Sequence, residues 1–133
     1  MTQSLLKIKN VKKAYRKYNL FGQEVSKFSA LNGLNLNVNK GQIYGFLGPN
    51  GAGKTTTIKC IIGILEADSG EIIIDGKNIK NNELYFKNKI GFLPEQVGLY
   101  GRLTAKETLQ LYGGFFDLST DVIEKRGKNL LAR

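Results

Sequence analysis

The nine residues GPNGAGKTT, from Gly48 to Thr56, constrain this chain more than any other stretch. They satisfy the pattern G-x-x-x-x-G-K-[ST], in which glycines let the backbone turn so that several N–H groups point into one concavity. The preceding apolar residues, QIYGFLG, predict a buried strand over 42–48, and the following residues predict a helix over 54–65. A strand, a glycine loop and a helix in this order predict an α/β domain that binds phosphate groups.

The residue types in the loop suit a triphosphate with magnesium. The helix that begins there offers unpaired N–H groups and the positive end of its dipole to an anion. Lys54 would bring a mobile charge to the outer phosphates, and the Thr55 hydroxyl can ligate Mg²⁺. The alternative is a glycine-rich turn without a ligand. The expected phosphate-binding residues are Gly48, Pro49, Asn50, Gly51, Ala52, Gly53, Lys54, Thr55 and Thr56.

Composition favours one ordered domain with a basic surface. The chain has 133 residues, of which 41% are hydrophobic, so it can bury a core. The net charge is +9, and the lysines are scattered rather than gathered in a dense run. We expect a solvated basic surface and no nucleic-acid partner. Contact with an acidic lipid surface or with a membrane partner is the alternative.

The location follows from three absences in the sequence. The first ten residues, MTQSLLKIKN, contain no long apolar region of a signal peptide, and the run CIIGIL is too short to cross a bilayer. The single cysteine, Cys60, excludes an internal disulfide framework and suits a reducing compartment, where it is expected to be a small core residue. We therefore expect a soluble, cytoplasmic chain that reaches the membrane through a partner.

Alternating apolar residues predict strands around the loop. Residues 5–15 are predicted to form one or two strands and 31–38 another, and 18–29 is predicted to be an irregular connection. A strand is also predicted over 71–79, with a hairpin turn at Asp75-Gly76. A last short strand is predicted over 89–94.

Two helices are predicted near the end of the chain. Thr104 and Glu107 form a capping-box pattern, so a helix is expected to begin there, and Ser119 is expected to cap the next one. The pair Gly113-Gly114 is expected to weaken the first helix. The apolar faces are predicted to consist of Leu109, Tyr112 and Phe116 in the first helix and Ile123, Leu130 and Leu131 in the second.

GPNGAGKTT closely resembles the Walker A motif of ATP-binding cassette (ABC) ATPases. The flanking residues 30–79 are similar to that family throughout, and 90–109, IGFLPEQVGLYGRLTAKETL, resembles the segment that contains its Q-loop. The resemblance implies an α/β P-loop NTPase core with an N-terminal antiparallel β subdomain over about 1–100 and the start of a helical subdomain over about 101–133. It implies ATP and Mg²⁺ as ligands. Within the family, the segment is similar to the ATPase subunits of exporters and ABC-2-type systems.

By this resemblance, Tyr15 would be the aromatic residue that stacks on adenine, with Tyr18 as a second candidate and plain strand packing as the alternative. The family places Gln directly after the Q-loop proline, but here Pro94 is followed by Glu95 and then Gln96. Either residue offers an oxygen to Mg²⁺ or water, and a solvent-exposed pair is the alternative.

Two segments imitate later motifs of the family. IIID, residues 72–75, has the form of a Walker B, but Gly76 follows where the family has Glu, so a hairpin turn is the better interpretation. LYGGF, residues 111–115, faintly resembles the LSGGQ signature but lacks its serine and glutamine, and an ordinary helix is expected.

The resemblance implies a partial domain. The histidine count is 0, and the Walker B, the signature and the switch histidine should all follow the Q-loop. Hence we expect the first half of a nucleotide-binding domain, with the exposed edges of a half-built sheet. The implied function is the ATP-binding subunit of a transporter, working with a transmembrane permease and a second nucleotide-binding subunit at the inner face of the membrane. The alternatives are a non-catalytic nucleotide-binding module or half of a split domain. Another P-loop enzyme, such as a GTPase or a small-molecule kinase, is disfavoured because no N-K-x-D motif occurs and the flanking residues resemble ABC proteins.

Overall fold

The computed structural model describes residues 4–87, 89–95 and 98–132 and divides the chain into two compact units, Met1–Phe92 and Leu93–Arg133. No helix among these described residues has the length and hydropathy of a membrane span. In chain order the elements are β1 (Ser4–Tyr18), β2 (Glu24–Asn39), α1 (Lys54–Ile61), β3 (Ser69–Ile74), β4 (Lys77–Asn78), the 3₁₀ turn η1 (Ile79–Asn81), α2 (Glu83–Lys87), α3 (Ala105–Gly114) and α4 (Thr120–Leu131).

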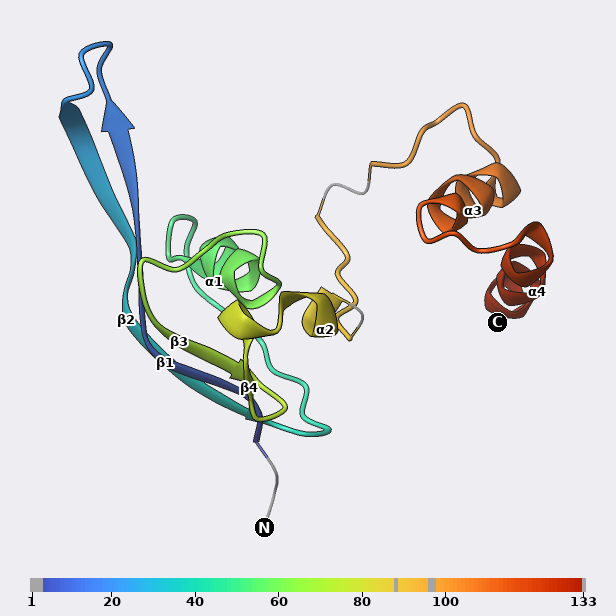
Figure 1. The fold of residues 1–133 in the computed structure, drawn as a ribbon, viewed down its shortest axis with the longest axis horizontal. Coiled ribbons are helices and arrows are strands. Elements are labelled where there is room, and N and C mark those ends of the chain that lie inside the picture. The colour runs from blue at the N-terminus through green and yellow to red at the C-terminus, as the bar shows by residue number, and fades with distance from the viewer. Residues whose placement is uncertain (1–3, 88, 96–97, 133) are drawn as a thin grey trace. The chain divides into compact units, whose positions relative to one another are not determined.

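The first unit is built on a four-stranded sheet in the order β2-β1-β3-β4 (Figure 1). All three pairings are antiparallel, which is the antiparallel β subdomain expected from the sequence. Asp75 and Gly76 turn the chain between β3 and β4 with φ angles of 49° and 76°, so the predicted hairpin turn is confirmed.

A bulge in β1 lets the neighbouring strand β3 approach closely. Asn10 has a φ of 48°, and the β1–β2 register shifts between Ile8 and Val11. A Cβ on Gly70 would lie 2.5 Å from the carbonyl oxygen of Asn10, so only glycine leaves room for β3 here. The bulge also turns Ile8 and Val11 toward the same side of the sheet, where both are buried.

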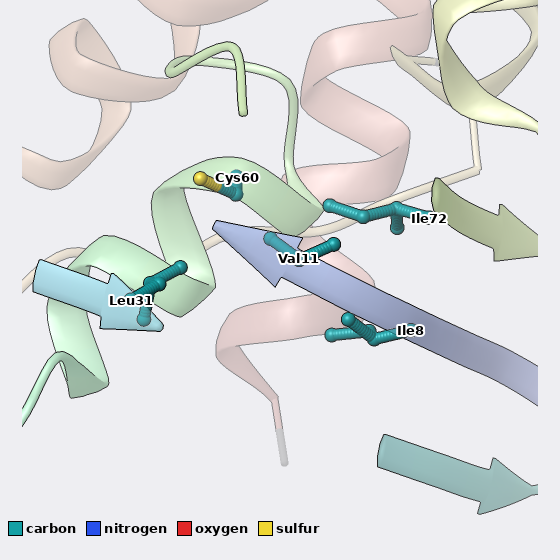
Figure 2. Packing of buried hydrophobic residues seen from close by; sticks show 5 residues of the cluster. All are labelled: Ile8, Val11, Leu31, Cys60 and Ile72. Carbon is teal, nitrogen blue, oxygen red and sulfur yellow. The ribbon is translucent and has the colours of Figure 1, made fainter. Parts of the chain in front are cut away.

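The core of the first unit lies between this face of the sheet and α1. Ile8, Val11, Leu31 and Ile72 from the strands meet Cys60 from α1, and all five are buried (Figure 2). Cys60 is only 2% exposed, and burial raises the pKa of its thiol. The expectation that Cys60 is a small core residue is therefore confirmed.

The second unit contains α3 and α4. Thr104 caps α3 with both bonds of the capping box, since Glu107 N–H donates to Thr104 Oγ1 at 3.3 Å and Thr104 N–H donates to Glu107 Oε2 at 2.8 Å. The bonds from Thr104 lower the pKa of the Glu107 carboxyl. Ile123 of α4 is buried, and a Cβ on Gly113 would lie 2.6 Å from its side chain. The glycine predicted to weaken α3 therefore also permits close packing between the helices.

Two predicted strands are wrong. Residues 42–48 and 89–94 adopt no strand conformation, and Ile43, Leu47 and Leu93 are 102%, 96% and 80% exposed. A buried parallel strand forms only between neighbouring strands that satisfy its backbone groups. The described residues contain no parallel pairing, so these apolar segments have nothing to join.

The prediction that residues 18–29 form an irregular connection is also wrong. Its second half belongs to β2, and only the short turn around Asn19 and Gln23 is irregular. Smaller corrections concern the helices. α1 ends at Ile61 rather than at residue 65, Phe116 lies beyond the end of α3, and Ser119 occupies the N-cap of α4 without a side-chain hydrogen bond.

Candidate phosphate-binding site

The loop over residues 48–53 has the backbone conformation that its glycines permit. Gly48, Gly51 and Gly53 have φ angles of 151°, 86° and 85°, a region that residues with a Cβ rarely enter. Ala52 N–H donates to the Pro49 carbonyl at 3.3 Å and closes a turn within the loop. The sequence therefore folds locally as the motif predicts, even though the strand before it does not form.

Gly53 joins this loop to the sheet. A Cβ at this position would lie 2.6 Å from the carbonyl oxygen of Ala30 and 2.9 Å from the side chain of Leu31, both in β2. Gly51 differs, because a Cβ there would meet no heavy atom within 4 Å. Thus Gly51 is needed for conformation alone, whereas Gly53 is needed for conformation and for close approach.

The N-terminus of α1 offers its backbone amides without a capping side chain. Gly53 is the N-cap and has no side chain to accept from the first turn. Thr57 N–H is the first amide of the helix to bond within it, to Gly53 O at 2.8 Å. The amides of Lys54, Thr55 and Thr56 are the orphan donors that any α-helix leaves at its start. This arrangement favours an anion at the loop.

Lys54 holds its ammonium against the same loop. Its Nζ donates to the carbonyl oxygens of Gly48 and Pro49 at 2.6 and 2.8 Å. The side chain therefore folds back over the loop rather than out into solvent. A phosphate oxygen that displaced either carbonyl would find a positive charge already positioned beside the helix N-terminus.

The three consecutive threonines at the start of α1 have different roles. Thr57 Oγ1 donates to Gly53 O at 2.9 Å, and Thr56 Oγ1 lies 3.3 Å from the hydroxyl of Tyr15; both threonines are buried. Thr55 is exposed, and its hydroxyl makes no hydrogen bond within the described residues. It is thus the threonine that fits an Mg²⁺ ion, which prefers oxygen ligands and keeps several waters. No group of three or more His, Cys, Asp or Glu side chains among the described residues could hold a metal.

Tyr15 lies beside this site, and Tyr18 lies farther along the same strand. The hydroxyl contact with Thr56 connects Tyr15 to the first turn of α1, while the side chain remains 44% exposed. Tyr18 is 58% exposed, three residues closer to the end of β1. The structure therefore brings Tyr15 to the first turn of α1, whereas Tyr18 lies opposite Glu24 near the tip of the hairpin.

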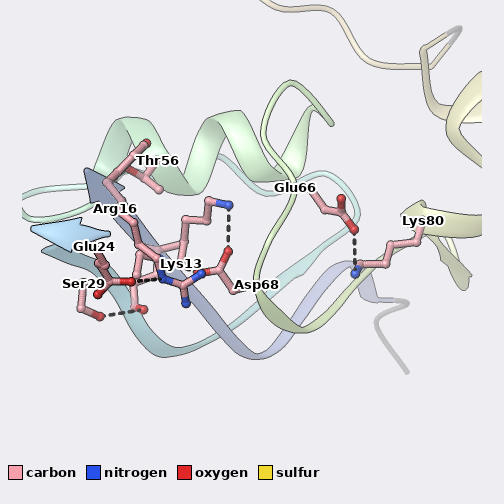
Figure 3. Close-up of polar contacts among 11 residues, drawn as sticks. Lys13, Arg16, Glu24, Ser29, Thr56, Glu66, Asp68 and Lys80 are labelled. Atoms are coloured by element: carbon pink, nitrogen blue, oxygen red, sulfur yellow. Dashed lines mark hydrogen bonds and ion pairs between the residues drawn. The ribbon is translucent and has the colours of Figure 1, made fainter. Parts of the chain in front are cut away.

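An ion pair between β1 and the segment that follows α1 was missed in the sequence. Lys13 Nζ lies 2.9 Å from Asp68 Oδ1, and Ala14 N–H donates to Asp68 Oδ2 at 2.8 Å (Figure 3). These contacts lower the pKa of the Asp68 carboxyl, the bond from Lys13 contributing most. They attach the segment after α1 to β1. A charge pair separated by 55 residues leaves no local signal in a sequence.

The structure describes both imitations of later motifs, and of the two Q-loop candidates it describes only Glu95. Glu95 belongs to the second unit and is exposed, and Gln96 lies outside the described residues. Asp75 of the Walker B imitation sits in the β3–β4 turn and accepts a hydrogen bond from the Tyr85 hydroxyl at 3.3 Å. The LYGGF segment spans the end of α3. Both imitations are therefore structural, as the sequence predicts.

A cavity of about 320 Å³ opens at the other end of α1 and is distinct from the glycine loop. Glu66 and Lys80 form an ion pair of 3.0 Å at this cavity (Figure 3). Its lining mixes aliphatic with polar and charged residues, and it includes no residue of the glycine loop. The lining residues include Cys60, Leu65, Ala67, Ile72 and Ile79.

Comparison with known proteins agrees with the geometry of the loop. The family model for ABC transporters matches residues 31–132. The chain is 37% identical over 127 residues to the linearmycin resistance ATP-binding protein LnrL of Bacillus subtilis (strain 168), a match that covers 96% of this chain and 38% of that protein. It is 50% identical over 76 residues to the bacitracin transport ATP-binding protein BcrA of Bacillus licheniformis, covering 57% of this chain and 25% of that protein.

Solved structures show the same likeness. The ATP-binding cassette MJ0796, in a dimeric structure of a post-hydrolysis state bound to ADP and Pi, matches with a TM-score of 0.76 and 28% identity, covering 96% of this chain and 56% of that one. The chain thus spans about two fifths of its curated relative LnrL and about half of this solved cassette.

Proposed function

The chain belongs to the ABC transporter family, and on that premise we propose that it binds Mg·ATP through the loop at residues 48–56. The observation that carries this proposal is the loop itself. Three glycines with positive φ lead into the uncapped N-terminus of α1, and the Lys54 ammonium lies over them, bonded to the loop carbonyls.

We propose the remaining ligand contacts from the motif and from its resemblance to the Walker A and Q-loop segments of the family. Backbone amides from Gly51 to Thr56 would donate to the phosphates, and Lys54 would exchange its carbonyl partners for the outer phosphates. The Thr55 hydroxyl would ligate Mg²⁺. The ring of Tyr15 would stack on adenine, a role that its contact with Thr56 supports. Glu95 or Gln96 would add an oxygen near the metal.

For the whole protein we propose ATP hydrolysis coupled to membrane transport. ATP would close two nucleotide-binding subunits on each other, and this closure would move a transmembrane permease. The subunit would then lie in the cytoplasm against the inner face of the membrane, held there by the permease. Linearmycin resistance and bacitracin transport in the names of two relatives support an exporter-type role.

For the 133 residues alone we propose binding with little or no turnover. Hydrolysis needs a metal ligand on the far side, a group that positions water, and stabilisation of the charge that develops. The segments IIID and LYGGF, which imitate the motifs that supply these groups, lie instead at the end of strand β3 with its turn and at the end of helix α3. We therefore propose that residues 1–133 form a partial nucleotide-binding domain that binds ATP.

Calorimetric titration with Mg·ATP tests the binding proposal. Lys54→Ala removes charge-assisted bonds of about 1.5–3 kcal/mol, so the affinity should fall roughly ten- to a hundredfold. Lys59→Ala is the matched control, because Lys59 is an exposed lysine in the same helix, and it should keep the wild-type affinity. Equal affinity in the two variants would contradict the proposal.

Measurement of phosphate release tests whether residues 1–133 hydrolyse ATP. The wild-type chain should release phosphate from ATP no faster than its Lys54→Ala variant does. Turnover that depends on Lys54 would refute the proposal that residues 1–133 bind without hydrolysing, while leaving the binding site intact.

A further inference from the structure

The distal part of the β1–β2 hairpin, residues 16–27, forms an arm that extends past the rest of the sheet, at the upper left of Figure 1. β3 pairs with β1 only as far as Lys12, which lies opposite Ser69, whereas β1 and β2 pair onward to Tyr18 opposite Glu24. Every residue of the arm except Asn19 is exposed. A two-stranded hairpin gains little stability from its own burial, so both faces of this arm are available to a partner.

The tip of the arm displays two large apolar side chains. Leu20 is 102% exposed and Phe21 is 88% exposed. Turn positions are ordinarily filled by Gly, Asn, Asp, Ser or Pro, whose conformational or hydrogen-bonding properties suit a turn. Two adjacent apolar residues at the tip serve neither purpose here.

The turn that carries these residues is well ordered by hydrogen bonds. Asn19 Oδ1 accepts from the N–H groups of Phe21 and Gln23 at 3.0 and 2.9 Å, and Asn19 Nδ2 donates to Gln23 Oε1 at 3.0 Å. A backbone bond from Asn19 N–H to Gln23 O, also 3.0 Å, closes the hairpin. The hydrogen bonds of this turn therefore hold Leu20 and Phe21 in their exposed positions.

Cationic side chains surround the arm behind this tip. Arg16 is paired with Glu24, with Nε and Oε2 3.5 Å apart, whereas Lys17 and Lys27 make no ion pair within the described part of the chain. Arg16 lies opposite Lys27, and Lys17 lies opposite Ser26. Because side chains alternate along a strand, Lys17 and Lys27 project from opposite faces of the arm.

This arrangement fits the layers of a lipid bilayer. Leu20 follows Lys17 by three positions, and since Asn19 and Leu20 lie in the turn beyond β1, the two side chains are separated along the arm by at most about 10 Å. Apolar side chains of interfacial proteins enter the boundary between headgroups and acyl chains by about 5–10 Å. If Leu20 and Phe21 reach that depth, both lysines lie at the level of the headgroups. Tyr18, which is 58% exposed and lies between Lys17 and Leu20, is of a type enriched at this interface.

We propose that the arm docks tip-first onto a bilayer that carries acidic lipids, with Leu20 and Phe21 inserted and Lys17 and Lys27 against the headgroup charges. A protein groove would be expected to cover one face of a hairpin. Here cations occupy both faces, and the most exposed apolar side chains, Leu20 and Phe21, lie at the end, with Val25 61% exposed behind them. The arm also lies outside residues 31–132, which the family model matches. The proposal does not depend on nucleotide binding.

The absence of tryptophan makes a direct test possible. The chain has no Trp, so Phe21→Trp introduces a single fluorophore at the tip. Its emission should shift to the blue on mixing with vesicles of phosphatidylcholine containing about a third phosphatidylglycerol, without nucleotide. It should shift far less with pure phosphatidylcholine. Phe115→Trp is the matched control, since Phe115 is 72% exposed in the other unit, and its emission should stay unchanged.

Two variants separate the apolar and charged contributions in a vesicle co-sedimentation assay. Leu20→Ser/Phe21→Ser should weaken binding at least about tenfold, because both inserted side chains are lost. Lys17→Gln/Lys27→Gln should weaken binding to acidic vesicles about fivefold for each charge removed and should abolish the preference over neutral vesicles. Phe115→Ser/Phe116→Ser removes two exposed apolar residues elsewhere and should leave binding unchanged.

Three results would overturn the proposal. The first is the absence of a blue shift from the Phe21→Trp variant with acidic vesicles. The second is an equal shift from the Phe21→Trp and Phe115→Trp variants, which would indicate general adhesion of exposed apolar surface. The third is a shift that occurs with native membranes but disappears after protease treatment of those membranes, which would identify a protein as the occupant.

Discussion

A pair of alanine substitutions in the glycine loop tests how the structure explains its spacing. Gly51 and Gly53 have nearly the same φ, 86° and 85°, but only Gly53 faces the sheet. The left-handed conformation costs a residue with a Cβ about 1–2 kcal/mol, and both variants should suffer that cost. Gly53→Ala must also separate its Cβ from the Ala30 carbonyl, which would lie 2.6 Å away.

The additional cost at Gly53 follows from overpacking, which typically destabilises a protein by about 1–3 kcal/mol. We therefore expect Gly51→Ala to lower the free energy of unfolding of the first unit by about 1–2 kcal/mol, and Gly53→Ala by roughly 2–5 kcal/mol. With a urea dependence of about 1–3 kcal/mol per molar, the two unfolding midpoints should differ by roughly 1 M.

Hydrogen–deuterium exchange across a urea series measures the difference between the two unfolding midpoints in the segments that contact each other. Peptides from β2 and α1 report the contact between Gly53 and Ala30, and peptides from α3, in the other unit, serve as an internal reference. Equal midpoints for the two variants would refute the assignment of Gly53 to close packing against the sheet.

Two further predictions concern single side chains. Tyr15→Ala should weaken Mg·ATP binding about two- to tenfold through lost stacking, whereas Tyr18→Ala should not; equal effects in a fluorescent-nucleotide titration would exclude Tyr15 as the base-stacking residue. The pKa of the Glu107 carboxyl is lowered by its bonds from Thr104, so the capping box stabilises α3 fully above the ordinary carboxyl pKa and loses this contribution as the pH falls through the lowered value. NMR chemical shifts of the first turn of α3 should therefore report lost helicity at low pH in the wild-type chain, and Glu107→Gln should reduce that dependence. The part that remains belongs to Glu124, whose pKa is lowered by its bond from Lys106 of α3.

Features that depend on a few neighbouring residues were predicted from the sequence. The capping box of Thr104 and Glu107 and the Asp75-Gly76 turn each lie within a single short stretch of chain. The glycine loop is equally local, and its backbone folds as expected without the preceding strand. In each case the interacting groups are encoded side by side, so local stereochemistry determines the outcome.

Features that depend on distant partners were predicted less well. Ile43 and Leu47 have the composition of a buried strand, but a strand forms only where another supplies hydrogen bonds, and none does among the described residues. The hairpin arm was mistaken for an irregular connection because its turn depends on the Asn19 side chain rather than on an Asn-Gly or Asp-Gly pair.

The candidate site shows the same division. Gly48 to Thr56 could be named from their order in the chain. Tyr15 is the first base-stacking candidate from the resemblance, and only the structure adds its contact with Thr56. Thr55 is the proposed metal ligand from the motif, and only the structure adds that Thr56 and Thr57 are engaged elsewhere. Such contacts depend on which strands and helices pack together. The order of residues along a single sequence does not reveal that packing.

Protection of the loop amides by nucleotide tests the central proposal most directly. Hydrogen–deuterium exchange of the segment 48–57 should slow on addition of Mg·ATP, because the backbone N–H groups from Gly51 to Thr56 would then donate to phosphate oxygens. The same protection should appear in Lys59→Ala and should be lost in Lys54→Ala at equal nucleotide concentration. Unchanged exchange of these amides in the wild-type chain at saturating Mg·ATP would contradict the assignment of this loop as the phosphate site.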